Sequence, residues 1–222
     1  NITDDTRLQA HKDTLSDLAE SGARVALVSH LGRPKGKKRQ DLSLRPVVQY
    51  LKQHMGLSVS FCEETVGPEV ENAMSTLEPG TFTLLENVRF SPGEEKNDPS
   101  FAEQLAAPFD YFVMDAFSAA HRAHASTEGV TRYLSASAGR LMEREISYLG
   151  SVRDDPEHPY TLILGGAKVS DKIGVIENML GKVDTILVGG GMMFTFFKAQ
   201  GLSIGQSLCE EEYVPLARKL LA

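Results

Sequence analysis

Short apolar runs alternate with amphipathic stretches along this chain, and this alternation restricts the possible folds more than any other feature. Strand–helix alternation with short links is typical of parallel sheets with right-handed crossovers. We therefore predict an α/β fold made of parallel sheets with flanking helices. The expected strands are 25–29, 57–61, 82–85, 111–114, 160–164 and 185–188, and the expected helices are 4–20, 43–55, 68–77, 100–107, 134–150, 170–180, 192–199 and 210–221.

Polar residues that favour helix starts support these boundaries. Thr3 or Asp4 before the first helix, and Ser43 and Asp98 before later ones, stand where a side-chain oxygen can accept a hydrogen bond from the first turn. Val25–Ser29 is continuously apolar, which is typical of a strand buried on both faces. In the longer helix 134–150, Leu141, Ile146 and Leu149 are expected to point inward.

A polar segment with two prolines, Arg153–Pro159, is the best domain boundary in the sequence. We predict two Rossmann-like domains, the second incomplete: residues 1–133 form the first, 134–159 an interdomain helix and linker, and 160–222 the start of the second. The chain begins at Asn1 without Met, and 214–222 breaks off within an apolar helical pattern. We expect a piece of a longer protein.

Composition narrows the range of partners. Asp and Glu number 30 against 23 Lys and Arg, a formal charge of −7, so neither nucleic acid nor a membrane surface is an expected partner. No apolar stretch approaches the ~20 residues of a membrane span. Cys62 and Cys209 lack metal-ligand spacing and are expected to be free thiols, consistent with a cytoplasmic location.

Basic residues repeatedly follow the predicted strands. Ligands of open α/β sheets bind outside the carboxyl ends of the strands. The pattern therefore predicts a site for a strongly anionic small molecule, most simply a phosphate ester. The residues concerned are His30 and Arg33 after the first strand, Arg89 and Arg122 after later ones, and Lys168 and Lys172 after strand 160–164.

Glycines and lysines join strand 160–164 to the next helix. Gly165 and Gly166 allow close approach of a ligand, the helix start offers free N–H groups, and Lys168 and Lys172 would share a helix face. A tight turn with two solvated lysines is the alternative. Glycines 189–191 repeat the arrangement one strand later, but here the alternative, a close strand–helix crossing, is the stronger interpretation, because triple glycine carries no charge. Neither segment has Walker A or GxGxxG spacing.

The loop His30–Pro34 contains Gly32 and Pro34, which constrain the turn on both sides of Arg33. Arginine's planar guanidinium suits bidentate recognition of phosphate or carboxylate. His121 and His124 are three residues apart, but no third ligand has matching spacing, so packing and orienting hydrogen bonds are the favoured interpretation and no metal site is expected.

Six blocks together resemble the phosphoglycerate kinase family, in the family's order and across the whole chain. They are residues 2–7 (ITDDTR), 29–34 (SHLGRP), 84–90 (LLENVRF), 115–126 (DAFSAAHRAHAS), 164–172 (LGGAKVSDK) and 188–192 (VGGGM). The resemblance implies reversible phosphoryl transfer between ATP and the carboxylate of 3-phosphoglycerate, giving 1,3-bisphosphoglycerate and ADP in glycolysis, by a monomer.

The same resemblance implies roles for individual residues. The acid would be held by the first domain, through Arg7, His30, Leu31, Gly32, Arg33, Arg89 and Arg122. The nucleotide would be held by the second, through Gly165, Gly166, Ala167, Lys168, Lys172, Gly189 and Gly190. Arg7 and Lys168 would stabilise the transferring group. The nucleotide would be ATP or ADP with Mg²⁺, and the ion would be held mainly through the nucleotide. The Asp that contacts the metal in the family lies outside this chain.

The sequence also departs from the family's pattern. Ser118 stands where the family usually has Gly. The family's first strand, with its Asp-Phe-Asn segment, and most of its second domain lack counterparts here, so we expect the 222 residues alone not to be a competent kinase. Two alternatives stay open: a nucleotide-dependent dehydrogenase, disfavoured by the missing GxGxxG, and an anion- or nucleotide-binding module without catalysis.

Overall fold

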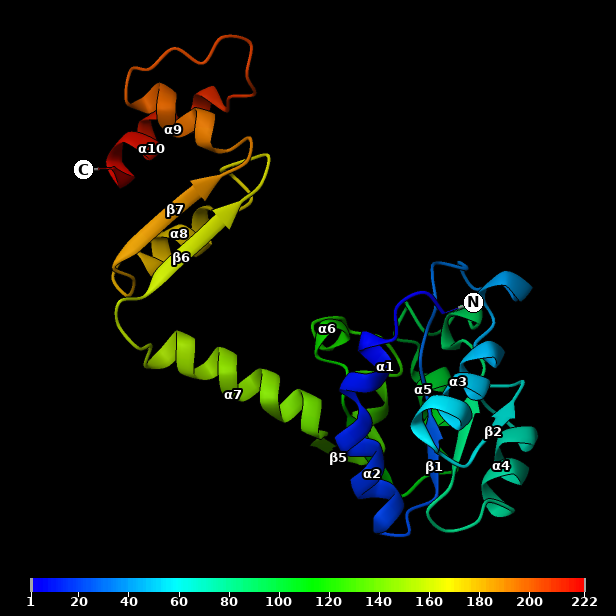
Figure 1. Cartoon of the computed structure of the whole chain (residues 1–222). Helices are drawn as coiled ribbons and strands as arrows, with labels where there is room; N and C mark the ends of the chain where they lie inside the picture. The colour runs from blue at the N-terminus through cyan, green and yellow to red at the C-terminus, as the bar shows by residue number, and fades with distance from the viewer. Residues whose placement is uncertain (1, 222) are drawn as a thin grey trace. The chain divides into compact units, whose positions relative to one another are not determined.

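The computed structural model describes residues 2–221, which form two compact units (Figure 1). Unit 1 ends at Ser147 and unit 2 begins at Tyr148. The division falls within helix α7 (Arg140–Asp154), none of whose residues is buried. Ile146 and Leu149, expected to point inward, are 51% and 50% exposed, so that expectation is wrong.

Unit 1 is built of alternating strands and helices, as the apolar pattern predicts. Its strands are β1 (Val25–Leu27), β2 (Val59–Cys62), β3 (Phe82–Leu85), β4 (Tyr111–Met114) and β5 (Ser135–Ala138), and its helices are α1 (Thr6–Ala10), α2 (Lys12–Glu20), α3 (Arg45–Met55), α4 (Pro68–Ser75), α5 (Pro99–Ala106) and α6 (Phe117–Ala120), with short 3₁₀ turns at Gln40–Leu42, Val88–Phe90 and Gly129–Arg132.

The strands of unit 1 form two parallel sheets. One has the order β1-β3-β2, with Val25 and Val59 both opposite Phe82, and the other pairs β4 with β5, Tyr111 opposite Ser135. An open cleft of about 1540 Å³ is lined by residues of both β1 and β4. This volume exceeds the ~300–1,000 Å³ of ordinary ligand pockets, so we interpret the cleft as a gap between the two sheets.

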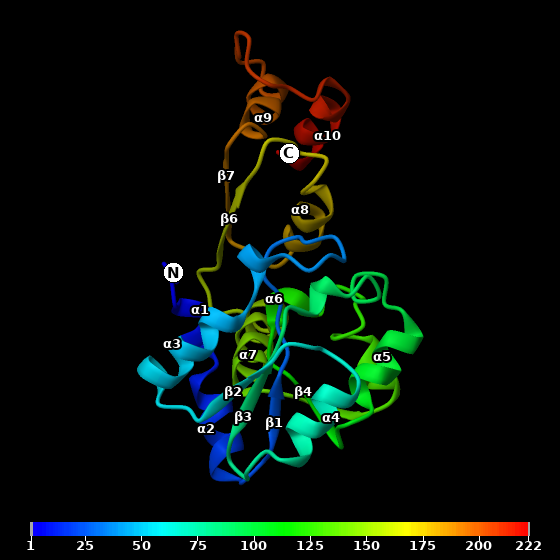
Figure 2. The ribbon, with the colours of Figure 1, turned by 90° about the vertical axis from the view of Figure 1, so that its right-hand side faces the viewer.

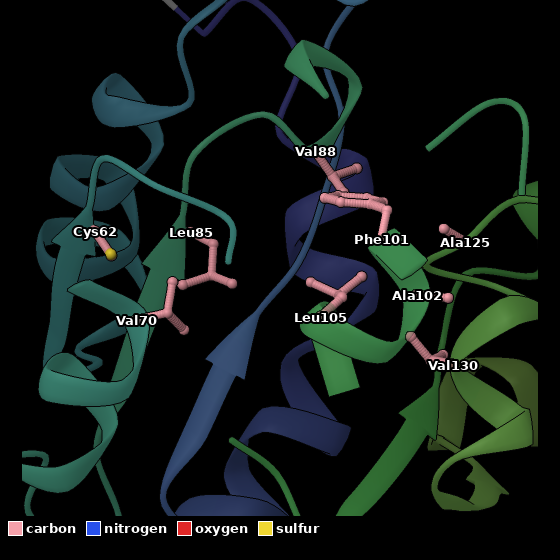
Figure 3. Close-up of a cluster of buried hydrophobic side chains, with 9 residues drawn as sticks. All are labelled: Cys62, Val70, Leu85, Val88, Phe101, Ala102, Leu105, Ala125 and Val130. Carbon is pink, nitrogen blue, oxygen red and sulfur yellow. The ribbon is translucent and has the colours of Figure 1, made fainter. Parts of the chain in front are cut away.

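The core of unit 1 lies on both faces of β3, whose four residues are all buried. Helices α2 and α3 contribute Leu15 and Leu51 to one cluster with Phe82 and Leu84. Helices α4 and α5 lie on the opposite side (Figure 2). They contribute to the second cluster, drawn in Figure 3, which contains Cys62, Val70, Leu85, Val88, Phe101, Ala102, Leu105, Ala125 and Val130. β3 is thus a central strand that positions the residues following it.

Unit 2 contains one two-stranded parallel sheet and a single core. Strands β6 (Thr161–Gly165) and β7 (Thr185–Gly189) pair in register, with Gly165 opposite Gly189. Helices α8 (Ile173–Met179), α9 (Met193–Ala199) and α10 (Val214–Leu220) supply the rest of the unit, with a 3₁₀ turn at Glu211–Tyr213. Their shared core contains Leu164, Val169, Ile176, Met192, Phe196, Ala199 and Ala217.

The predicted α/β class with parallel strands is confirmed, since every described strand pair is parallel. Of the predicted caps, Asp98 is confirmed as the N-cap of α5, since Phe101 N–H donates to Asp98 Oδ1 at 2.9 Å. Asp4 and Ser43 accept from the N–H groups of Thr6 at 2.9 Å and Arg45 at 3.2 Å but lie one residue before the N-caps of α1 and α3, which are Asp5 and Leu44, so those two cap predictions are wrong. Among residues 2–221, no helix is long and apolar enough to cross a membrane.

Three local predictions are wrong. The helix expected over 134–150 begins only at Arg140, because Ser135–Ala138 pair with β4 as strand β5. The helix expected over 4–20 is divided at His11, whose imidazole contacts Asp115 at 2.9 Å. Strand β1 is only half buried rather than enclosed on both faces, because it is the edge strand of its sheet and faces the cleft.

Candidate functional site

The loop after β1 is tied to the segment after β3 by hydrogen bonds. Val88 N–H donates to the carbonyl oxygen of Ser29 at 3.1 Å, and Arg89 Nη1 donates to that of Gly32 at 2.9 Å. Arg89 is 5% exposed, and its Nε lies 3.4 Å from Glu95 Oε1. Two of the predicted binding segments, 30–33 and Arg89, are therefore brought together.

Asn87 supplies further links at the same place. Its side chain is fully buried, with 0% exposure. Its Nδ2 donates to the carbonyl oxygens of Leu31 at 2.8 Å and Leu42 at 2.9 Å, and its Oδ1 accepts from Arg89 N–H at 3.1 Å. One carboxamide thus connects three loop segments.

Glu94 anchors the segment that carries Arg122. The Glu94 side chain is nearly inaccessible, and the residue is 2% exposed. Its carboxylate accepts from Ser126 N–H at 2.9 Å and from Ser126 Oγ at 2.6 Å, and lies 3.6 Å from His124 Nδ1. His124, part of the His121–His124 pair, therefore has an orienting contact of the kind expected from the sequence.

His30 sits among positive charges. Its ring keeps contact with solvent, but partial burial is the largest cause lowering its pKa to about 4, and Arg89, Arg122 and His124 lower it further, against a smaller opposing effect of Glu95. An ordinary histidine titrates near 6.5. The part of this lowering that comes from Arg89 and Arg122 indicates that cations gather around His30, as an anion-binding site requires.

Three predicted arginines keep their guanidinium groups free of carboxylates. Among residues 2–221, Arg7, Arg33 and Arg122 form no salt bridge, whereas Arg39, Arg45, Arg132, Arg140, Arg144 and Arg153 each pair with an acidic side chain. Arg33 is exposed in the loop after β1 and Arg7 on α1, and Arg7 and His30 both line the cleft. These cations are available to a negatively charged ligand.

In unit 2, glycines bring the loops after β6 and β7 into backbone contact. Met192 N–H donates to the Gly166 carbonyl oxygen at 3.0 Å. Gly190 has φ +70°, and a β-carbon there would lie 2.7 Å from the Gly166 oxygen and 2.9 Å from its nitrogen. Gly191 approaches Ala167 almost as closely, since its β-carbon would lie 3.1 Å from the Ala167 oxygen. The predicted nucleotide-binding residues Gly165, Gly166, Ala167, Gly189 and Gly190 are thus neighbours.

The two lysines of this region do not share a helix face, contrary to the prediction. Helix α8 begins at Ile173 with Lys172 as its N-cap, so Lys168 and Lys172 both lie in the preceding loop. Glu210 explains the late start, because its carboxylate accepts from the N–H groups of Val169 at 2.5 Å and Ser170 at 3.1 Å and from Ser170 Oγ at 2.7 Å. These bonds hold the loop in a non-helical form.

The charge of Glu210 is stabilised by the loop that it holds. The Ser170 hydroxyl, the two backbone N–H groups and Lys168 lower the pKa of its carboxyl group, against a smaller opposing effect of desolvation. Its own N–H donates to Thr195 Oγ1 at 3.2 Å, and Thr195 is 1% exposed. Glu210 is therefore part of a network that connects α9 to the loop 166–172.

Sequence reasoning missed the residues that hold these loops: Asn87, Glu94 and Glu210. Their partners lie 56, 32 and 40 residues away in Leu31, Ser126 and Ser170, too far for a local pattern to indicate. The spacing of Asn87 two residues before Arg89 was the only available signal. Within residues 2–221, no group of three His, Cys, Asp or Glu side chains could hold a metal ion.

Comparison with known proteins gives a consistent result. The family model described as "Phosphoglycerate kinase" matches residues 1–222. The phosphoglycerate kinase of Moorella thermoacetica is 57% identical over 220 residues, covering 99% of this chain and 56% of that protein, and that of Gloeothece citriformis is 54% identical over 223 residues, covering 100% and 56%.

Solved structures agree with the sequence comparison. The phosphoglycerate kinase structure from Coxiella burnetii has a TM-score of 0.86 at 42% identity, covering 100% of this chain and 55% of that one. The structure from Pyrococcus horikoshii OT3 has a TM-score of 0.81 at 31% identity, covering 100% and 58%. The chain spans about half the length of the curated relatives that it matches.

Proposed function

Because the chain belongs to the phosphoglycerate kinase family, we propose that this protein serves reversible phosphoryl transfer between ATP and the carboxylate of 3-phosphoglycerate. The products are 1,3-bisphosphoglycerate and ADP. The observation that carries the proposal is the gathering of His30, Arg89 and Arg122 in unit 1: partial burial first, and then the charges of Arg89 and Arg122, lower the pKa of His30 to about 4.

We assign the acid to residues 1–133. Arg33 and Arg122 provide unpaired guanidinium groups for the phosphate and carboxylate, and His30 with the Leu31–Gly32 backbone contributes uncharged hydrogen-bonding groups. Arg89 contributes mainly through the positive potential, because it is 5% exposed and one of its donors already bonds Gly32. Residues 134–159 connect this domain to the next.

We assign the nucleotide to residues 160–222. Gly165, Gly166 and Ala167 present backbone to the phosphate chain, and Lys168 and Lys172 offer ammonium groups against its charge. Gly189 and Gly190 contribute bare backbone near the adenine side. The support for this assignment is the contact between the two glycine loops, with Met192 N–H bonded to Gly166 at 3.0 Å.

The chemistry needs charge stabilisation more than proton transfer. A carboxylate oxygen of 3-phosphoglycerate attacks the γ-phosphorus, the bond from that phosphorus to the ADP oxygen breaks, and ADP leaves with the bonding electrons. The attacking carboxylate is already ionised at neutral pH, with a usual pKa of about 4, so no general base is required. Arg7 and Lys168 are proposed to stabilise the negative charge on the transferring group, as phosphoryl transfer demands.

Mg²⁺ is expected to accompany the nucleotide phosphates. Residues 2–221 offer no carboxylate cluster that could hold the ion, so no step is assigned to it. The family also carries our proposals of a glycolytic role, a monomeric state and a cytoplasmic location.

Calorimetric titration of the 222-residue chain tests both assignments. We expect 3-phosphoglycerate and ADP to bind independently. Arg33→Ala and Arg122→Ala should each weaken binding of the acid about tenfold or more and leave ADP binding unchanged, because one charge-assisted hydrogen bond contributes ~1.5–3 kcal/mol. Lys172→Ala should have the reverse effect.

The matched control is Arg24→Ala, which removes an exposed guanidinium that precedes β1 and so lies at the opposite end of that strand. It should leave both affinities unchanged. Loss of acid binding in Arg24→Ala equal to that in Arg33→Ala would show a diffuse charge effect and contradict the assigned site. Absence of acid binding by the unmodified chain would contradict the assignment to residues 1–133.

A further inference from the structure

We propose that Asn87 is a positioning residue, which fixes the loop His30–Arg33 and Arg89 relative to each other and so determines affinity for the acid substrate. The effect on affinity for the acid substrate rests on the proposed function. The positioning itself is a property of unit 1 that can be measured without ligand. Asn87 does not touch the ligand in this proposal; it acts through Leu31 and Arg89.

The contacts of Asn87 use both donors of its carboxamide and one of the two lone pairs of its oxygen. Nδ2 uses its two protons on Leu31 and Leu42, at 2.8 and 2.9 Å, and Oδ1 accepts from Arg89 N–H at 3.1 Å. Because Asn87 is 0% exposed, solvent water does not reach its carboxamide to replace a lost hydrogen-bond partner. Only a side chain with two donors and an acceptor at this length can make all three bonds.

The neighbours of Asn87 reinforce the same junction. Glu86 Oε1 accepts from Asn87 N–H at 2.7 Å and from Leu44 N–H at 2.9 Å, and Glu86 Oε2 accepts from Ser43 Oγ at 2.6 Å. Glu86, the residue before Asn87, is therefore fixed to Ser43 and Leu44. This leaves the carboxamide free to hold the loop after β1, with Arg89 supplying a second tie at Gly32.

If Asn87 had only a structural role, its replacement would lower the stability of unit 1 but leave the environment of His30 in the folded protein unchanged. Release of Leu31 would let the adjacent His30 move into solvent and away from Arg89. Both changes raise the pKa of His30 from about 4 toward 6.5. The titration of His30 in the folded population, followed by NMR, therefore reports positioning separately from stability.

The experiment compares Asn87→Ala with Asn72→Ala in the whole 222-residue chain. Asn72 is exposed on α4, so its replacement makes the same chemical change without touching the loops. We expect Asn87→Ala to raise the pKa of His30 by at least about one unit and to raise the Kd for 3-phosphoglycerate about tenfold, since two buried hydrogen bonds to loops are lost. Asn72→Ala should change neither.

A folded Asn87→Ala chain with the wild-type pKa of His30 and wild-type Kd would overturn the inference. A shifted pKa with unchanged Kd would retain the positioning role and overturn its effect on binding. If the unmodified chain binds no 3-phosphoglycerate, the proposed function fails at this domain, while the pKa of His30 still decides whether Asn87 positions the loop.

Two further measurements apply if Asn87→Ala does not fold. Asn87→Leu keeps a similar volume and removes both donors without adding a charge, so the same rise in the pKa of His30 and in Kd is expected. In the unmodified chain, the side-chain amide protons of Asn87 should exchange with solvent much more slowly than those of Asn72. Exchange of both amides at similar rates would overturn the inference.

Discussion

In unit 1, buried side chains hold the loops that carry the predicted acid-binding residues, whereas in unit 2 close backbone contacts between glycines, together with the partly exposed side chain of Glu210, hold the predicted nucleotide-binding loops. Asn87 and Glu94 are 0% and 2% exposed and bond across 30 to 60 residues of sequence. Gly190 instead approaches Gly166 so closely that no β-carbon fits. The loops of unit 1 are thus held by side-chain hydrogen bonds, and those of unit 2 mainly by backbone contacts that are possible only because glycine has no β-carbon.

The largest effect is expected from adding a methyl group in unit 2. Gly190→Ala should destabilise this unit by about 3 kcal/mol, because alanine is strained at φ +70° and its β-carbon would lie 2.7 Å from the Gly166 carbonyl oxygen. Urea titration followed by NMR resonances of unit 2 measures this loss. Gly174→Ala in α8, where a β-carbon meets nothing within 4 Å, should instead leave stability unchanged or raise it. An equal change in unfolding free energy for Gly190→Ala and Gly174→Ala would contradict the idea that close glycine contacts hold the loops of unit 2.

In unit 1 the corresponding effect comes from removing charge. Glu94→Gln should cost about 2 kcal/mol of unfolding free energy, since a buried carboxylate that accepts two hydrogen bonds from Ser126 loses one good acceptor. The measurement is urea unfolding followed by NMR resonances of unit 1. Glu143→Gln, at a position whose side chain is 62% exposed, is the control and should change stability little. A similar small loss for Glu94→Gln would mean that Ser126 is held by other contacts.

The same substitution in unit 2 should have a smaller effect. Glu210 accepts three hydrogen bonds through its carboxylate, but it remains partly exposed, so water can replace a lost acceptor. Because its folded pKa is lowered, its contribution is present above the usual value of 4.5 and is lost as pH falls through the folded pKa. Glu210→Gln should remove this part of the acid sensitivity of unit 2. A loss equal to that of Glu94→Gln would show that side chains hold both loops alike.

The smallest expected effect is the change that His30 causes in the stability of unit 1 with pH. The pKa of His30 is about 4 when folded and 6.5 in its ordinary state, so the unfolded chain binds more protons between these values. His30 therefore lowers the stability of unit 1 as pH falls from about 6.5 to about 4, with a slope reduced by the solvent contact of the ring. His30→Gln should flatten this dependence between pH 6.5 and 5 and leave unit 2 unaffected. An unchanged slope in unit 1 would indicate that His30 titrates normally.

The strand positions and the basic residues after them could be predicted from the sequence, because apolar runs and charge are local signals. Strand β5 could not, since Ser135–Ala138 has no apolar run and forms a strand only through pairing with β4. The loop form of Lys168 and Lys172 depends on Glu210, about 40 residues away. The loop 30–33 is held by Asn87, 56 residues from Leu31, and the segment with Arg122 by Glu94, 32 residues from Ser126. Long-range hydrogen bonds leave no periodic pattern to detect.

His30 also changes what the basic cluster of unit 1 can recognise. At neutral pH a pKa of about 4 leaves the imidazole uncharged, with one nitrogen that donates and one that accepts. Arginines can only donate, so they pair equally with any bare oxygen anion. A neutral imidazole beside them can also accept a hydrogen bond from a hydroxyl group, which allows the cluster to distinguish a hydroxylated anion from one that carries only oxyanions.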